Sequence, residues 1–318
     1  MTAIPQTIPQ YVAQVREALT GADPAVVQDA LYDAEEHLRA ELAANPGVAE
    51  AEMLRRIATS YGSPEEVAAI YRDTEVTVSR AMRTPAPPPR RTAAGRFFGV
   101  ASDPRTWGAL FYMLLSLVTG VVYFTWAVTG VSLSLGLSLL VVGVFFIVFF
   151  VGTTRALSLL EGRLVETLLG VRMPRRPAYP SRGEPLLRRI GQMFTDPRTW
   201  STLLYFALML PLGVAYFTTA LTGLLLSVGL LFAPIAALFI DGAHVGVAVY
   251  DGQPAVPPAI AIPMAALLGV VLLFATLHLA RAVGGLHGWI AHRLLVLSGT
   301  AVPEAAAPTG GRAVAAGT

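Results

Sequence analysis

Four side chains that could bind a ligand or titrate lie close together in this 318-residue chain: Asp241, His244, Tyr250 and Asp251. Asp241 and His244 are three residues apart, so one helical turn would place a carboxylate and an imidazole on the same face. Two candidate ligands are too few for a zinc site, and we predict no metal here. His244 beside two acids could instead respond to pH. We predict that these four residues act in sensing, with a plain solvated loop as the alternative.

Other patterns that carry chemistry are missing from the sequence. The chain has no cysteine, which excludes disulfides, thiolate metal sites and a cysteine nucleophile. It also has no glycine-rich phosphate loop, no H-E-x-x-H and no G-x-S-x-G. We therefore expect no catalysis, no cofactor and no direct nucleic-acid binding. An enzyme that acts on lipids has no motif to support it.

The composition is that of a membrane protein. Hydrophobic residues make up 54% of the chain and charged residues only 14%, with a mean hydropathy of +0.58. A soluble domain carries about 25% charged residues. The charge is divided along the chain, since residues 1–80 have a net charge of −7 and residues 81–318 one of +9. This pattern predicts a cytosolic acidic domain followed by a multi-spanning membrane domain.

Residues 1–80 have apolar residues at helical spacing. Asp23-Pro24 is a typical helix start, and Ser63 and Glu66 are spaced as a capping box. One helix carries Asp29, Asp33 and Glu36 on its polar face. We predict that these three acids dock a cytosolic partner, with a simply solvated face as the alternative. Residues 81–96 form a Pro/Arg-rich linker.

The membrane part contains a duplicated unit. The motif Asp-Pro-Arg-Thr-Trp at 103–107 recurs at 196–200, an offset of 93. Farther along, Arg155-Ala156 matches Arg281-Ala282 at an offset of 126, so the second unit holds about 33 extra residues. We predict membrane repeat 1 at 97–175, a cytosolic connection at 176–195, and membrane repeat 2 at 196–299. The second repeat has an outer insertion at about 240–260, and residues 300–318 form a disordered tail.

The span count follows from length and from the placement of arginine. Residues 106–154 have no charged side chain and suffice for two spans. Arginines flank the apolar regions at 155–198 and after 280 but are missing from 241–258, which places both termini in the cytoplasm. We predict four spans, two repeats in parallel orientation, and a re-entrant or interfacial segment at 223–240. Five spans are the alternative. The fold class is thus all-α, and the location a bacterial plasma membrane crossed several times.

Each repeat is expected to leave the membrane through an amphipathic helix, at about 155–170 and 281–296. These helices would lie on the inner leaflet or pack together as a relay. Ala280, Gly284 and Gly288 form a ridge of small residues where helices can approach closely. We predict that this ridge packs against another helix, either within the chain or in a homodimer.

Two parts of the chain resemble known families. Tyr11 to about Arg72 resembles the HAAS domain, a small helical bacterial signalling module, through YVAQVREALTGADP, DALYDAEEHLRAEL and YGSPEEVAAIYR. Residues 97–299 resemble the sensor domain found ahead of actinobacterial histidine kinases, through GVVYFTWAVTGVSLSLG, PLGVAYFTTALTG and RALSLLEGRLVETLLGV. The first resemblance implies a PadR-like or sigma-type transcription regulator as partner. We expect no kinase domain after the second.

These observations predict a membrane signalling protein. The membrane unit would respond to an envelope cue or a lipid state, and the N-terminal domain would bind or release a cytosolic regulator. The alternative is an accessory or structural subunit of a membrane transport complex. Intramembrane acids or bases usually mark an ion path, and we find none in the predicted spans, which disfavours an independent coupled transporter.

Overall fold

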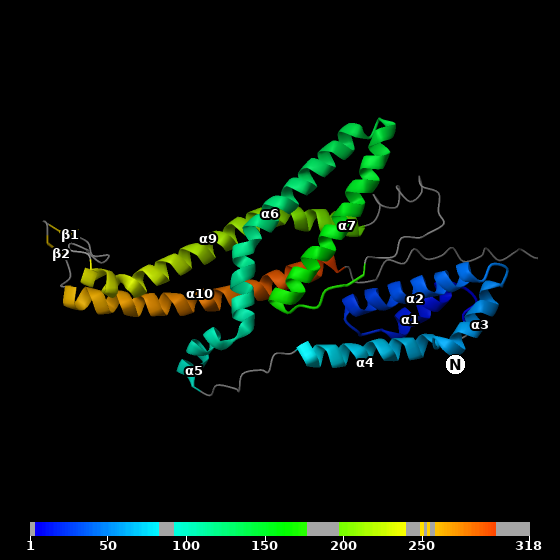
Figure 1. Ribbon diagram of the computed structural model, residues 1–318, viewed down its shortest axis with the longest axis horizontal. Coiled ribbons are helices and arrows are strands. Elements are labelled where there is room, and N and C mark those ends of the chain that lie inside the picture. Colours follow the sequence, from blue (N-terminus) through cyan, green and yellow to red (C-terminus); the bar gives the residue numbers. More distant parts are fainter. Residues whose placement is uncertain are drawn as a thin grey trace, which may run out of the picture.

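The structure is a computed structural model, and it describes residues 4–82, 92–176, 197–239, 249–250, 253–254 and 258–296. The described part is almost entirely helical, as predicted. Four helices form a bundle at the N-terminal end, and four long apolar helices make up most of the rest (Figure 1).

The N-terminal bundle consists of α1 (Ile8–Ala18), α2 (Pro24–Ala44), α3 (Glu50–Ser60) and α4 (Pro64–Met82). Its core is built from the apolar stripes of these helices, and Tyr11, Val15 and Leu38 are completely or almost completely buried there. Tyr11 also donates a hydrogen bond from its hydroxyl to the carbonyl of Gly62, 2.8 Å away, which links α1 to the turn before α4.

Both predicted helix starts are confirmed. The Asp23 side chain caps α2 by accepting a 2.8 Å hydrogen bond from the amide of Ala25. Ser63 and Glu66 form a reciprocal capping box, because the Ser63 amide donates to Glu66 Oε2 over 2.8 Å and the Glu66 amide donates to Ser63 Oγ over 3.3 Å.

The second part begins with two short helices, α5 (Ala93–Phe98) and the 3₁₀-helix η1 (Gly99–Ser102). The long helices are α6 (Pro104–Leu137), α7 (Val141–Leu169), α9 (Pro197–Phe239) and α10 (Pro258–Leu295). By length and composition each of the four can cross a membrane. Asp103 caps α6 through the amide of Arg105, as its Asp-Pro-Arg-Thr-Trp motif predicts.

Three predicted boundaries inside these helices are wrong. Residues 223–239 are not a separate re-entrant or interfacial segment, because α9 continues through them as one helix. Gly223 lies inside α9 and packs closely against Thr276 of α10. Likewise, residues 155–169 and 281–295 are not separate helices but the last turns of α7 and α10.

The two repeats cross where α6 meets α9. A Cβ at Gly120 would overlap the carbonyl oxygen of Met209, and a Cβ at Gly213 would overlap that of Ser116. The two contacts are equivalent under the 93-residue offset, so the repeats meet across an approximate twofold axis between α6 and α9. Only glycine lets the two backbones approach this closely.

Residue numbers rise along α6 as they fall along α9 through this crossing, so the two helices run in opposite directions there (Figure 1). If the twofold axis between the repeats lies along the membrane normal, as predicted for parallel repeats, both helices must be steeply tilted away from that normal. Their lengths allow this tilt. The 34 residues of α6 and the 43 of α9 correspond to about 51 and 65 Å, against a hydrocarbon core of about 30 Å. The orientation itself stays a prediction.

Two short antiparallel strands lie within the insertion of the second repeat. β1 (Val249–Tyr250) pairs with β2 (Gln253–Pro254) in the register Val249 to Pro254 and Tyr250 to Gln253. In the sequence this hairpin lies between α9 and α10.

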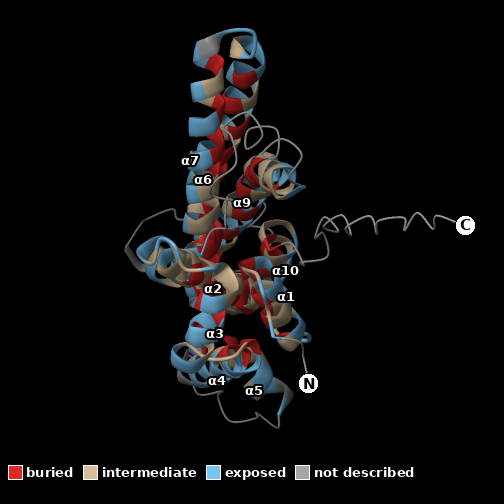
Figure 2. Cartoon of the chain, turned by 90° about the vertical axis from the view of Figure 1, so that its right-hand side faces the viewer, coloured by how far each residue is buried: buried red, intermediate tan, exposed pale blue. Residues whose placement is uncertain are grey.

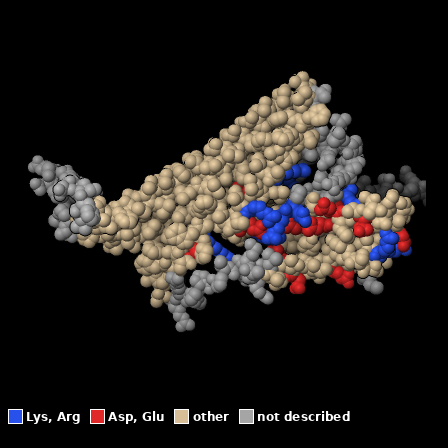
Figure 3. All heavy atoms as spheres, viewed as in Figure 1, with Lys and Arg blue, Asp and Glu red and all other residues tan. Residues whose placement is uncertain are grey.

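Buried residues concentrate where the long helices cross and in the bundle core, while much of the far end of the α6–α7 hairpin is exposed (Figure 2). The start of α2 joins the core of the second part, because Ala25 belongs to the same buried cluster as Tyr112, Met173 and Ala291. In the space-filling view the long helices are nearly free of charge, and acids and arginines gather where they meet the bundle (Figure 3).

Candidate functional site

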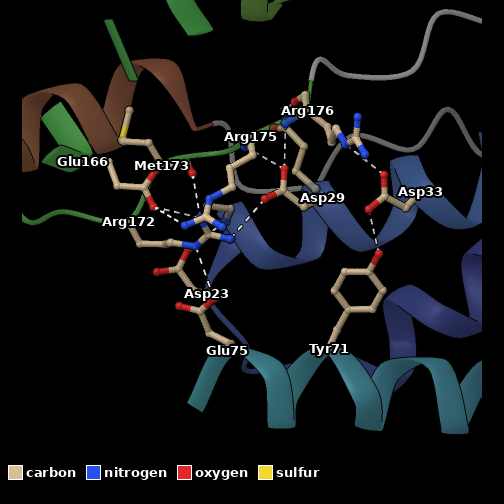
Figure 4. Close-up of polar contacts among 12 residues, drawn as sticks. Asp23, Asp29, Asp33, Tyr71, Glu75, Glu166, Arg172, Met173, Arg175 and Arg176 are labelled. Carbon is tan, nitrogen blue, oxygen red and sulfur yellow. Dashed lines mark hydrogen bonds and ion pairs between the residues drawn. The ribbon is translucent and has the colours of Figure 1, made fainter. Parts of the chain in front are cut away.

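A charged joint connects the membrane part to the N-terminal bundle. It consists of residues 171–176, which follow α7, together with the acids that they contact on α2, α4 and α7. Gly170 ends α7 in a left-handed conformation with φ of 71°, which turns the chain away from the helix. Asp29 Oδ1 then accepts hydrogen bonds from the backbone amides of Arg175 and Arg176, at 2.7 and 2.8 Å (Figure 4).

Arg172 is the centre of this joint. Its guanidinium reaches three carboxylates from three helices: Asp29 of α2 at 3.2 Å, Glu75 of α4 at 3.3 Å, and Glu166 of α7 at 2.9 Å. Its side chain is only 18% exposed, so these interactions are less screened than surface ion pairs. One arginine therefore ties the last turns of α7 to two helices of the bundle.

Two further arginines extend the joint on either side. Arg175 pairs with Glu166 at 3.1 Å, and Arg176 pairs with Asp33 at 3.0 Å. Asp33 also accepts a 2.8 Å hydrogen bond from the hydroxyl of Tyr71 on α4. The joint thus joins α2 and α4 to each other as well as to residues 171–176.

Burial dominates the electrostatics of Asp29. It raises the pKa of this carboxyl above the ordinary value, while the amides of Arg175 and Arg176 and the charge of Arg172 oppose the rise. Burial also raises the pKa of Tyr71, and its hydrogen bond to Asp33 adds to that effect. The two amides and Arg172 thus favour the charged carboxylate, whereas burial favours the protonated one.

The three predicted docking residues fall on one stripe of α2, but the chain itself occupies part of it. Asp29 is 6% exposed and Asp33 is half-buried, and both bind residues 172–176. Glu36 is half-buried farther along the same helix. Sequence reasoning missed the arginines. The run RMPRR at 172–176, with its opposite charge to α2, is the signal that could have found them.

A second polar cluster lies inside the membrane part, among α6, α7, α9 and α10. The hydroxyls of Tyr112 and Tyr205 approach Glu161 Oε1 to 2.5 and 2.8 Å, and His287 Nε2 to 2.6 and 2.9 Å. All four side chains are 0–1% exposed. Each tyrosine can therefore bridge the acid and the imidazole.

The cluster follows the sequence repeat. Tyr112 and Tyr205 differ by 93 positions, and Glu161 and His287 differ by 126, the two offsets of the duplicated unit. It therefore lies on the interface between the repeats, and each repeat contributes one tyrosine and one ionisable group. A comparison of the offsets residue by residue would have found this pairing.

The prediction that the spans hold no buried acid is wrong, because Glu161 lies completely buried inside a helix that can cross a membrane. The sequence predicted a separate amphipathic helix at about 155–170, which contains Glu161, whereas α7 is continuous through these residues. Glu161 of α7 and His287 of α10 meet in this cluster through Tyr112, so the two helices pack together there. A role of the two helices as a relay stays a prediction.

The ridge of small residues packs within the chain. Ala280 is fully buried, a Cβ at Gly284 would contact Ala109 of α6, and one at Gly288 would contact Val171. The ridge thus lets α10 approach α6 and the start of the joint. Homodimer formation stays a prediction.

The predicted sensing residues Asp241, His244 and Asp251 lie outside the described residues, and Tyr250 is described only as part of β1. Within the ranges that the structure describes, no group of three or more His, Cys, Asp or Glu residues could hold a metal ion. The sensing role of the outer insertion stays a prediction.

Comparison with known families agrees with both resemblances. A family model described as "Putative sensor" matches residues 112–295, and one described as HAAS matches residues 10–70. No curated protein and no solved structure matches the chain. The HAAS match covers most of α1 to α4, and the other match contains the whole polar cluster.

Proposed function

The chain belongs to the Sensor family, whose model covers more than half of its length, and from that premise we propose that it transmits a state of its membrane domain to a cytosolic regulator through the HAAS bundle. Four helices suited to a membrane, a sensor domain and a HAAS domain make it a membrane sensor-type signalling protein. The proposal also places the protein in the plasma membrane with both termini in the cytoplasm, where the regulator would bind.

The observation that carries the proposal is the contact of Arg172 with α2, α4 and α7. Because residues 171–176 follow α7 directly, a shift or rotation of α7 would move Arg172 relative to the carboxylates of the bundle. Such a shift needs two states of the membrane domain that differ in how well the joint closes. The cue would favour one of those states.

The output would be the acidic stripe of α2. With the joint closed, Asp29 and Asp33 are bound by the chain's own residues 172–176. A regulator that docks on Asp29, Asp33 and Glu36 would therefore bind best when the joint opens. The HAAS resemblance implies a PadR-like or sigma-type regulator. No part of this scheme uses catalysis.

The test is a crosslinked pull-down of the full-length protein from its own host, beside a version that lacks residues 1–80 and a variant with Arg172, Arg175 and Arg176 changed to alanine. We expect a transcription regulator with the full-length protein, more of it with the triple variant, and none with the truncation. Arg55→Ala is the control, because Arg55 pairs with Glu52 on α3 with both side chains 60% exposed.

Two results would contradict the proposal. If the full-length and truncated proteins recover the same transport subunits, the chain is an accessory subunit of a membrane complex. If the triple variant recovers no more regulator than Arg55→Ala does, the joint does not control docking.

A further inference from the structure

Two adjoining pockets lie at the side of the membrane part where α7 meets the start of α9. The first encloses about 60 Å³ and is polar on one side. Two arginines line it, Arg155 of α7 and Arg198 of α9, together with hydroxyl side chains from the same two helices. These hydroxyls belong to Thr154, Ser158, Thr199 and Thr202. Arginine and hydroxyl groups at one place are the donors that recognise a phosphate.

The second pocket is larger, about 300 Å³, and its walls are almost wholly apolar. It lies among α6, α7 and the first turns of α9, with Val131, Phe150 and Leu203 in its lining. Such a pocket, formed by helices that can cross a membrane, has the surface chemistry of a site for a hydrocarbon chain.

The two pockets adjoin each other, because Val151 and Thr199 line both. A ligand that filled both would carry a phosphate at one end and a hydrocarbon chain at the other.

Two hydroxyls at these pockets lack partners. Among the residues that the structure describes, Thr199 Oγ1 and Ser134 Oγ are buried and have no hydrogen-bond partner. Ser134 is only 7% exposed and lines the apolar pocket, where a buried polar group without a partner costs stability. An oxygen acceptor on the ligand, such as an ester carbonyl, would satisfy such a donor.

From these observations we propose that the two pockets form one binding site for an anionic phospholipid. The phosphate would lie against Arg155 and Arg198, and an acyl chain would enter the space between Phe150 and Leu203. An anionic headgroup should bind better than a zwitterionic one, because the ammonium of a zwitterionic headgroup would be repelled by the same two arginines.

The site also touches the charged joint. Gln28 of α2, together with Met173 and Pro174 of the joint, lines the polar pocket. Gln28 Nε2 donates a 2.8 Å hydrogen bond to the carbonyl of Arg176. A bound headgroup would therefore contact both sides of the joint. This signalling role rests on the proposed function, whereas lipid binding itself does not.

The experiment measures lipid binding by native mass spectrometry of the full-length protein in detergent, with dioleoyl phosphatidylglycerol or dioleoyl phosphatidylcholine added. We expect the anionic lipid to bind about tenfold more tightly, and Arg155→Gln with Arg198→Gln to remove most of that preference. Arg105→Gln is the matched control, because Arg105 is the repeat equivalent of Arg198 but lines neither pocket.

A second variant tests the apolar pocket. Leu203→Trp should fill it and weaken binding of the anionic lipid about tenfold while both arginines remain. The melting temperature without added lipid shows whether each variant folds, and the single change Arg198→Gln replaces the double variant if that one does not. A soluble competitor, sn-glycerol 1-phosphate at millimolar concentration, should not displace the lipid.

Three results would overturn the site. The first is equal binding of the two lipids, and the second is an unchanged preference for the anionic lipid in the folded arginine variants. The third is full displacement of the lipid by glycerol phosphate, which would identify a site for free phosphate. Because no regulator is present, these results are independent of the pull-down. Lipid binding without regulator capture would leave the site standing and contradict only its signalling role.

Discussion

Glu161 and His287 meet through the hydroxyl of Tyr112, which lies 2.5 Å from Glu161 Oε1 and 2.6 Å from His287 Nε2. The two residues are 126 positions apart and occupy equivalent places in the two repeats. The duplicated unit thus meets its own copy with an acid on one side and an imidazole on the other. Such a pair favours one assembly of the repeats, because two identical groups could not complement each other.

This equivalence predicts that the two side chains can be exchanged. Glu161→His alone, or His287→Glu alone, leaves two like groups facing the same hydroxyls and should cost roughly 3 kcal/mol of stability. The double exchange should recover a coupling of at least about 1 kcal/mol. Thermal unfolding in detergent measures all three variants, with Glu17→His, at an exposed position of α1, as the control. A double variant as unstable as the sum of the two single ones would refute the pairing.

The crossing of α6 and α9 predicts opposite effects for two classes of glycine. Gly120→Ala and Gly213→Ala should each destabilise the protein by about 1–3 kcal/mol, since the new methyl group would overlap a backbone oxygen. A Cβ at Gly136 or Gly229 would meet no atom within 4 Å. Alanine at these two sites should be neutral or stabilise by up to about 1 kcal/mol. Equal melting temperatures for both classes would contradict the crossing.

Asp29 predicts a difference between two substitutions. Asp29→Asn keeps an oxygen that can accept from the amides of Arg175 and Arg176, and should cost little. Asp29→Ala leaves the amides of Arg175 and Arg176 without this acceptor and should cost about 1–3 kcal/mol. Hydrogen exchange at residues 171–176 in the full-length protein measures the effect. Faster exchange in both variants alike would show that the charge, not the acceptor, holds the joint.

The raised pKa of Asp29 also gives a pH dependence with a definite sign. The folded protein holds the proton of this carboxyl more tightly than the unfolded chain does. The contribution of Asp29 is therefore greatest below the ordinary pKa of aspartate, and it declines as the pH rises from that value through the raised one. The difference in unfolding free energy between the wild type and Asp29→Asn, followed from low pH to neutral pH, checks this trend.

The capping box at the start of α4 predicts a local loss of stability. Ser63→Ala removes the acceptor of the Glu66 amide and should destabilise the bundle by about 1 kcal/mol. Hydrogen exchange in the first turns of α4 should quicken. Thr59→Ala is the control, since the Thr59 hydroxyl bonds only within its own helix, to the carbonyl of Arg56. No difference between the two variants would rule out a role for the box.

The predicted topology can be tested at Gly252. The chain has no cysteine, so Gly252→Cys introduces a single reactive thiol. If the outer insertion faces away from the cytoplasm, an impermeant maleimide should label this thiol in intact cells. Ser60→Cys in the N-terminal bundle should be labelled only after lysis. Protection at position 252 would favour the five-span arrangement.

Local chemistry determined much of the fold in advance. Asp23, Ser63 with Glu66, and Asp103 cap the helices that the sequence predicts, because a cap needs only a side chain and the next few amides. The low charge of residues 106–154 and 199–239 likewise required apolar helices. The repeat was visible because its motifs survive as identical letters.

Tertiary structure decided the sites. Asp29 and Arg175 are 146 positions apart, and Tyr112 and His287 are 175 apart, so no local pattern joins them. Their contacts exist because the repeats cross at two glycines and because residues 171–176 turn back onto α2. The sequence determined where the capped helices α2, α4 and α6 begin, but not that α7, α9 and α10 continue unbroken. Only the packing of those helices decided which acid faces which arginine, since burial and charge pairing depend on what the rest of the chain places nearby.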